Sequence, residues 1–318
     1  MLAIEIFQPE RSPAGQRAGP PRSFGPYAWS VLLYNLAVVL WGAYVRATGS
    51  GAGCGNRWPL CPGIGSPQSP SAATLIEFTH RATSALDAVL VALLVVWAYR
   101  AFPRRHPARL GAALSAVFLV TEALLGMSLV LLDHVARNAS TARAYSLSAH
   151  LINTLTLLAC LTVTAWWGSG GPAVRPRGKP AWMAAATLAA VAALGVTGAF
   201  AALGDTLYPP QSLAQGLAQD MAPSASIFLR VRLIHPVAAA AVTGWLLLYA
   251  MSTARRRTEV RRRARNMVLL AGIQMAAGAV NVVLLVPVWM QLVHLLLADL
   301  LWISLVLLCA SLLEAEPA

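Results

Sequence analysis

Charged residues are scarce in this sequence. Only 11% of its 318 residues are Asp, Glu, Lys or Arg, whereas soluble domains carry about 25%. No stretch has the composition of a separate soluble domain, and 58% of the chain is hydrophobic. The N-terminal tail, residues 1–26, lacks the apolar core of a cleavable signal peptide. These deficits predict an all-α integral membrane protein whose tail lies in the cytoplasm.

Acidic residues are fewer than basic ones, 12 against 24, which gives a net charge of +12. Such an excess can indicate a nucleic-acid partner. Here, however, the basic residues gather between apolar runs, as they do in the cytoplasmic loops of membrane proteins. We therefore expect membrane lipid and no nucleic acid as a partner. The basic segments contain Arg11, Arg17 and Arg22; Arg100, Arg104 and Arg105; Arg175, Arg177 and Lys179; and Arg255, Arg256, Arg257, Arg261, Arg262, Arg263 and Arg265.

Eight apolar runs are long enough to span a bilayer, which takes about 20 residues. Basic loops alternate along the chain with loops poor in Lys and Arg, and this alternation predicts the orientation. It places loops 47–76, 133–145 and 204–226 outside and both termini in the cytoplasm of a multi-pass cell-membrane protein. The predicted spans are 27–45, 77–99, 109–132, 146–167, 181–203, 227–251, 267–286 and 289–313.

The two halves of the chain resemble each other. Four spans in each half predict two pseudo-repeated four-helix bundles, residues 27–168 and 181–318, joined by a cytoplasmic linker at 169–180. The matching features are Trp41-Gly42-Ala43-Tyr44 with Thr197-Gly198-Ala199-Phe200, His80 with His235, Glu122 and Gly126 with Gln274 and Gly278, and His150 with His294.

Four of the six histidines lie at these repeated positions, in the first turns of even-numbered spans. Imidazole is a common axial ligand of heme iron, and helix bundles hold such cofactors between facing helices. Zinc or copper would also accept imidazole, but with only Glu77 nearby two histidines leave the shell of a small ion incomplete. The pattern therefore favours two heme sites, formed by His80 with His150 and by His235 with His294.

The two predicted sites differ in the residue three positions before their first histidine. Glu77 precedes His80 by one helical turn on the same face, whereas Arg232 takes the matching place before His235. A carboxylate can accept a proton or stabilise positive charge, and a guanidinium pairs well with a heme propionate. This difference predicts divided roles for the two sites. The alternative for Glu77 is an acid favoured at a helix start by the helix dipole.

Other polar and sulfur-bearing residues are open to more than one interpretation. Asp87, Glu122 and Asp299 lie within apolar spans, where ionisable groups suit either function or hydrogen bonding between helices. Cys54 and Cys61 share an external loop, where a disulfide persists, and such a bridge would be either a structural staple or a redox-active pair. The remaining cysteines, Cys160 and Cys309, are expected to be small apolar side chains.

Several of these segments together resemble the heme A synthase family. The first external loop, with Gly42-Ala43-Tyr44-Val45-Arg46-Ala47-Thr48-Gly49-Ser50-Gly51, Cys54 and Trp58-Pro59-Leu60-Cys61, is similar to that of the family. So are Glu77-Phe78-Thr79-His80-Arg81, His150-Leu151-Ile152-Asn153-Thr154, Ile234-His235-Pro236 and His294-Leu295-Leu296-Leu297-Ala298-Asp299. The resemblance extends from Tyr27 to about Leu313.

The resemblance implies an oxidoreductase that hydroxylates a ring methyl of heme O successively, giving the formyl group of heme A. It implies Glu77 as the catalytic acid, with His80 and His150 flanking the substrate heme. His235 and His294 would bind a heme b cofactor, and Cys54 and Cys61 would form the loop pair. A heme O synthase and an electron carrier are candidate partners, and a homo-oligomer stays open. The alternatives are a diheme electron-transfer protein without its own substrate and, from the repeat alone, a transporter.

Overall fold

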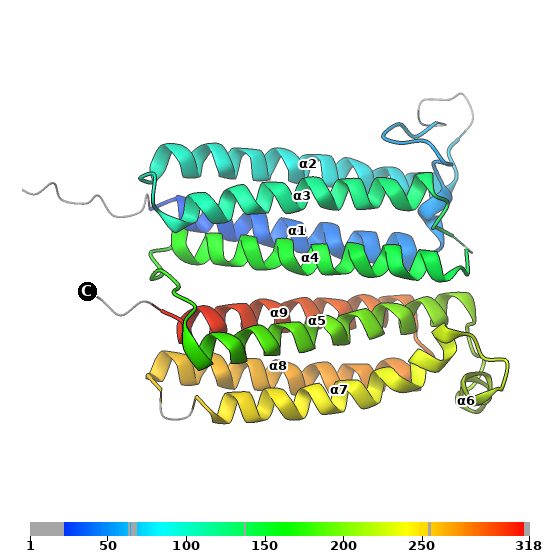
Figure 1. Ribbon diagram of the computed structural model, residues 1–318. Coiled ribbons are helices and arrows are strands. Elements are labelled where there is room, and N and C mark those ends of the chain that lie inside the picture. The colour runs from blue at the N-terminus through cyan, green and yellow to red at the C-terminus, as the bar shows by residue number, and fades with distance from the viewer. Residues whose placement is uncertain (1–21, 63, 65–68, 137, 254–255, 315–318) are drawn as a thin grey trace, which may run out of the picture.

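The computed structural model describes residues 22–62, 64, 69–136, 138–253 and 256–314, which form an all-helical protein (Figure 1). Residues 1–21 of the predicted tail and Arg255 lie outside the described part. Within that part, eight helices are long and apolar enough to cross a membrane, which confirms the predicted integral membrane fold. They are α1 (Phe24–Ala47), α2 (Ala72–Ala101), α3 (Pro107–Leu131), α4 (Thr141–Gly168), α5 (Gly178–Leu207), α7 (Ile227–Met251), α8 (Thr258–Val283) and α9 (Val288–Leu312).

The spans form two bundles of four, the first from α1 to α4 and the second from α5, α7, α8 and α9 (Figure 1). In each bundle, neighbours in the sequence pack together and the fourth helix packs back on the first. Contacts of α4 with α5 and α9, and of α1 with α9, join the bundles. The indole of Trp302 on α9 donates to the carbonyl of Leu155 on α4 at 2.7 Å. The order in which the helices pack is therefore similar in the two bundles, and the bundles contact each other directly.

The connections divide between the two ends of the molecule (Figure 1). One end, which we call the disulfide end, carries the loops 48–71, 132–140, 208–226 and 284–287. The other, the arginine end, carries loops 102–106, 169–177 and 252–257, the start of α1 and the end of α9. At the arginine end the backbone of Arg175 donates to the carbonyl of Leu313 at 2.8 Å. The loops predicted to share a side of the membrane thus lie at the same end of the molecule.

Several helices begin earlier than the apolar runs predicted. The helix α2 begins at Ala72 rather than at residue 77, and α4 begins at Thr141 rather than at residue 146. Serine side chains cap both helices: Ser71 accepts from the Thr74 amide and Ser140 from the Arg143 amide. The first turn of α4 contains Thr141 and Arg143, which end the apolar run, whereas the first turn of α2 is mostly apolar and its start is set by the Ser71 cap.

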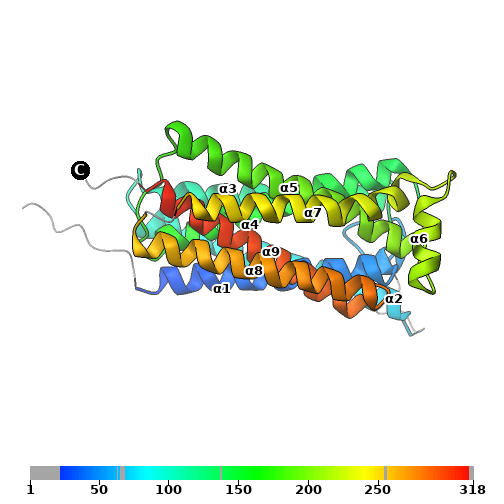
Figure 2. The ribbon, with the colours of Figure 1, turned by 90° about the horizontal axis from the view of Figure 1, so that it is seen from below.

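A further helix, α6 (Leu213–Met221), lies within the loop 204–226 and was not predicted. Figure 2 shows it crossing the disulfide end, roughly perpendicular to the spans. The side chain of Ser212 caps it by accepting from the Gln215 amide at 3.2 Å. With only 9 residues, α6 is too short to span a membrane.

Candidate heme sites

The four repeated histidines lie within the first three turns of α2, α4, α7 and α9, all counted from the disulfide end. Each bundle carries two of them, His80 and His150 in the first and His235 and His294 in the second. These are the two pairs that the sequence predicted. One pair lies within each bundle, at a similar distance from the disulfide end.

Each histidine ring lies against a glycine of the long helix before it. At three of the four glycines, a β-carbon would approach the ring more closely than nearly all real β-carbons approach a neighbour. Only glycine, which has no side chain, leaves room for the imidazole at these places. The distances from an added β-carbon to the ring Cε1 are 3.0 Å for Gly42 and His80, 3.9 Å for Gly126 and His150, 3.0 Å for Gly198 and His235, and 3.0 Å for Gly278 and His294.

The ring nitrogens retain capacity for a ligand. Among the described residues, the buried Nδ1 atoms of His80 and His294 have no hydrogen-bond partner, which is costly for a buried polar atom. The Nδ1 of His150 also lacks a hydrogen bond, but it faces the Glu122 carboxylate. The Nδ1 of His235 lies 2.9 Å from the hydroxyl of Thr197, a contact that orients the ring and leaves Nε2 for coordination.

Two imidazoles at each site match what a heme iron takes from a protein. In the described part of the chain, no three His, Cys, Asp or Glu side chains are grouped so as to hold a bare metal ion. The residues at both sites therefore fit a heme bound through a pair of histidines.

Glu122 and Gln274 contact corresponding histidines, as their register in the repeat predicts. Glu122 Oε2 on α3 lies 3.4 Å from His150 Nδ1, and Gln274 Nε2 on α8 lies 3.3 Å from His294 Nε2. The acid in the first half also accepts from Asn153 Nδ2 at 2.6 Å and from the Thr154 hydroxyl. These two donors explain how a carboxylate is stabilised within the first bundle.

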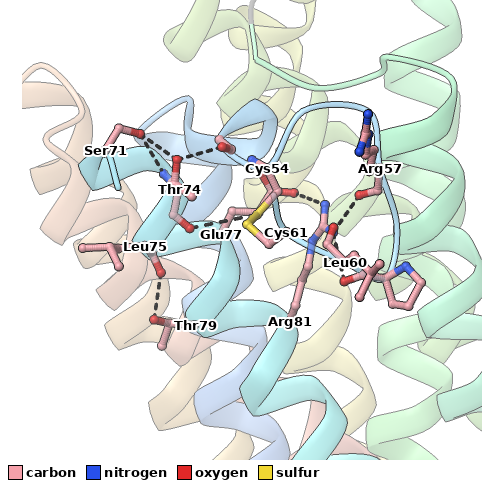
Figure 3. Close-up of a disulfide and its surroundings, with 12 residues drawn as sticks. Cys54, Arg57, Leu60, Cys61, Ser71, Thr74, Leu75, Glu77, Thr79 and Arg81 are labelled. Atoms are coloured by element: carbon pink, nitrogen blue, oxygen red, sulfur yellow. Dashed lines mark hydrogen bonds and ion pairs between the residues drawn. A yellow bond between two sulfur atoms is a disulfide. The ribbon is translucent and has the colours of Figure 1, made fainter. Parts of the chain in front are cut away.

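Glu77 lies in the second turn of α2 and is only 3% exposed, so it is not an acid at the helix start. Figure 3 shows its carboxylate next to the loop that carries the disulfide. Oε2 accepts from the backbone N–H of Cys54 at 2.8 Å. Oε1 accepts from Arg81 Nη2 at 2.5 Å. The residue that the sequence singled out as catalytic is therefore fixed at both oxygens, one helical turn from His80.

Cys54 and Cys61 form a disulfide, as predicted, with their Cα atoms 4.7 Å apart (Figure 3). The loop sits directly on the start of α2. The Thr74 hydroxyl donates to the carbonyl of Gly53 at 2.8 Å, and a β-carbon on Gly53 would come within 2.4 Å of the Ala73 backbone. The bridge thus closes a loop that packs against the turn before Glu77.

Arg232 is surrounded by protein acceptors. Its Nε and Nη2 donate to Asp220 Oδ1 on α6 at 2.8 and 2.5 Å, and Nη1 donates to Asp205 Oδ1 on α5 at 3.2 Å. Further bonds reach the side chain of Gln219 and the carbonyl of Tyr208. Sequence reasoning missed the two aspartates because it did not predict α6, which brings Asp220 to the arginine.

Sequence reasoning also missed Arg46, which joins the two bundles. This arginine on α1 donates from Nη1 to the hydroxyl of Thr206 at 2.8 Å and from Nη2 to Gln291 Oε1 at 2.9 Å. Its place in an otherwise uncharged stretch of the first span was the available signal. Of the polar residues at depth, Asp87 accepts from Asn35 Nδ2 at 2.5 Å, and Asp299 is 2% exposed with Oδ2 unpartnered among the described residues.

Comparison with known proteins identifies related chains. The model of the COX15-CtaA family, described as cytochrome oxidase assembly protein, matches residues 26–306. A protein named protoheme IX farnesyltransferase from Thermus thermophilus is 48% identical over 292 residues, which cover 91% of this chain and 48% of that protein. This chain thus spans about half the length of that relative.

Two shorter matches are to proteins named heme A synthase. The one from Geobacillus kaustophilus is 39% identical over 109 residues, 34% of this chain and 34% of that protein. The one from Bacillus mycoides is 44% identical over 95 residues, 30% of each chain.

Proposed function

Because this chain belongs to the COX15-CtaA cytochrome oxidase assembly protein family, we propose that it is a heme A synthase. The reaction is the oxidation of a ring methyl of heme O to the formyl group of heme A. The observation that carries the proposal is the pair of histidine sites, each lined by glycine, of which only the first has a buried acid one turn from its histidine.

In this proposal His80 and His150 hold the substrate heme, and Glu77 acts on the reacting edge. Two successive hydroxylations replace two methyl C–H bonds by C–OH, and the resulting gem-diol loses water to give the aldehyde. Relative to the methyl group and one water molecule, the formyl group has lost four electrons and four protons. In this proposal the electrons pass to the external electron carrier and the protons leave the site. A buried carboxylate that the Cys54 amide and Arg81 hold in place stabilises positive charge that develops beside it and can accept a proton.

The second half would bind heme b through His235 and His294. When bound, heme b supplies one-electron transfer between the substrate site and an external electron carrier. Thr197 orients the ring of His235, and Gln274 contacts that of His294. Arg232 would pair with a heme propionate, which would replace one of the acceptors on α6 that Arg232 contacts now.

A diheme electron-transfer protein without its own substrate is the second candidate. The repeated histidines suit it equally well, but it gives no role to Glu77. Its burial is compensated by Arg81 and the Cys54 amide, so burial alone does not decide between the two functions. Two equivalent electron-transfer hemes would, however, not require an acid at one site and an arginine at the matching place of the other. The asymmetry between Glu77 and Arg232 therefore favours the synthase.

The name of the Thermus relative raises farnesyl transfer as a third candidate. A prenyl diphosphate is bound through Mg²⁺ held by carboxylates, and the carboxylates within the spans here stand far apart in the sequence. Because this chain matches only 48% of that relative, we assign the farnesylation in its name to the remainder of its chain. The match of this chain to about half of a relative named for farnesyl transfer supports a heme O synthase as a functional partner that supplies the substrate.

Coexpression with a heme O synthase, followed by chromatography of extracted hemes, tests the proposal. The wild-type chain should accumulate heme A, whereas a plain electron-transfer protein would yield heme b and unchanged heme O. Glu77→Gln keeps the side-chain shape and removes the charge, so it should retain bound heme but lower heme A formation by about 100-fold or more. Near-normal heme A from this variant would remove Glu77 from the mechanism.

A further inference from the structure

We propose that Arg81 is a positioning residue that joins Glu77 and the disulfide loop, residues 54–61, into one rigid unit. The effect of this unit on the reaction rests on the proposed function, whereas its effect on the loop does not. Arg81 follows His80 directly on α2 and lies one turn after Glu77.

The guanidinium of Arg81 reaches acceptors on both the loop and the helix (Figure 3). Nη1 donates to the carbonyls of Arg57 at 2.7 Å, Pro59 at 3.2 Å and Leu60 at 2.9 Å. All three carbonyls lie between the two bridged cysteines. Nη2 donates to Glu77 Oε1 at 2.5 Å. One side chain thus holds both the loop and the carboxylate.

The second oxygen of Glu77 completes a closed circuit of contacts. It accepts from the amide of Cys54, the first residue of the same loop. The contacts form a closed ring: Cys54 bonds to Glu77, Glu77 to Arg81, and Arg81 to the loop carbonyls. The loop then continues to Cys61, which the disulfide links back to Cys54. The Glu77 and Arg81 side chains are only 4% and 12% exposed, so water screens this ion pair weakly.

The type of residue matters as much as its charge. A guanidinium presents several N–H groups in a fixed plane and can serve the carboxylate and the loop at once. A lysine ammonium carries its three N–H groups on one atom of a flexible chain, so pairing with Glu77 leaves too few donors, at one point, to hold the loop carbonyls as well. Without any cation, Glu77 becomes a buried charge lacking its counterion, which is strongly unfavourable. We therefore expect Arg81 to fix the direction of the carboxylate relative to His80.

The first test needs no enzymatic activity. In the purified full-length protein, reduction of the disulfide by a water-soluble phosphine is followed by thiol alkylation and mass spectrometry. Arg81→Gln should speed reduction roughly tenfold, because the loop loses its charge-assisted contacts. Arg230→Gln is the matched control, since Arg230 also donates to two loop carbonyls at this end, those of Ala225 and Pro223. Equal reduction rates in Arg81→Gln and wild type would overturn the proposal.

The second test measures heme A formation beside the content of bound heme. Arg81→Gln should lower conversion by about tenfold or more, because small displacements of a catalytic group are costly, while heme bound by His235 and His294 is retained. Relative to Arg81→Gln, Arg81→Lys should restore part of the conversion to heme A, but its disulfide should still be reduced faster than that of the wild type. A general loss of folding would not separate these two effects. Full conversion by Arg81→Gln would refute the positioning role. Absence of heme A from the wild type would instead refute the proposed function, even with the loop result intact.

Discussion

At three of the four histidines, a glycine stands where a β-carbon would collide with the imidazole ring. The spacing of Gly198 and His235 in sequence gives no hint of this contact, because it arises only when α5 packs on α7. The repeat did single out the glycines, since it aligns Gly42 with Gly198 and Gly126 with Gly278. Their purpose, to let a helix approach a histidine ring closely, became visible only with the packing.

Substitution of Gly198 should therefore damage the second site selectively. In Gly198→Ala the new β-carbon would lie 3.0 Å from Cε1 of His235, an overpacking that costs about 1–3 kcal/mol. The ring must tilt, so the low-spin heme signal in the optical spectrum should fall toward that of His235→Ala.

Gly244→Ala is the control for this change, because no atom lies within 4 Å of a β-carbon added there. It removes a flexible residue from α7 and should stabilise the helix by up to about 1 kcal/mol. Unchanged heme content in Gly198→Ala would mean that the glycine is incidental to the histidine site.

The short helix α6 is tied to the rest of the molecule by Arg232 of α7. Its nine residues are too few to be stable as a helix in isolation. Asp220 near its C-terminal end bonds to Arg232 on α7, with side chains 10% and 8% exposed. The apolar pattern that predicted the spans cannot reveal such an element, because a buried ion pair between distant residues, rather than a long apolar face, holds it in place.

Asp220→Asn should loosen α6 while leaving the spans intact. The change keeps the shape and removes one of the two charges that face Arg232, at a cost of about 1.5–3 kcal/mol for a hydrogen bond to a charged group. Hydrogen–deuterium exchange of peptides covering 209–226 should accelerate, and exchange in α7 beyond its first turns should not.

The exposed pair of Glu259 with Arg262, at the arginine end, supplies the comparison. These side chains are 44% and 62% exposed, and surface ion pairs contribute only about 0–1 kcal/mol. Glu259→Gln should therefore leave local exchange almost unchanged. An equal response in both variants would show that burial of the Arg232 pair does not determine the stability of α6.

In the molecule as a whole, the number of spans could be predicted from the sequence, because hydropathy reports directly on helices that face lipid. The repeat led to the prediction of two bundles and of four heme-binding histidines, and the heme-binding role of these histidines stays a prediction. The interface between the bundles did not, since it depends on individual side chains such as Arg46 and Trp302, whose partners lie more than a hundred residues away. Long-range contacts of this kind leave no periodic pattern in the sequence.

The orientation of the molecule is a prediction that its two ends make testable. The basic loops all lie at the arginine end, together with the start of α1 and the end of α9, so the positive-inside rule places that end in the cytoplasm.

Two exposed alanines offer matched labelling sites: Ala218 on α6 at the disulfide end and Ala173 in the loop between α4 and α5. The background is low, because Cys54 and Cys61 are bridged and Cys160 and Cys309 are buried. The experiment uses cells whose envelope outside the cell membrane has been made permeable while the cell membrane stays sealed. A membrane-impermeant maleimide should then label Ala218→Cys at once and Ala173→Cys only after the cell membrane is permeabilised. Labelling in the reverse order would show that the protein has the opposite orientation. The disulfide loop and Glu77 would then lie on the reducing side of the membrane, where the bridge would not persist.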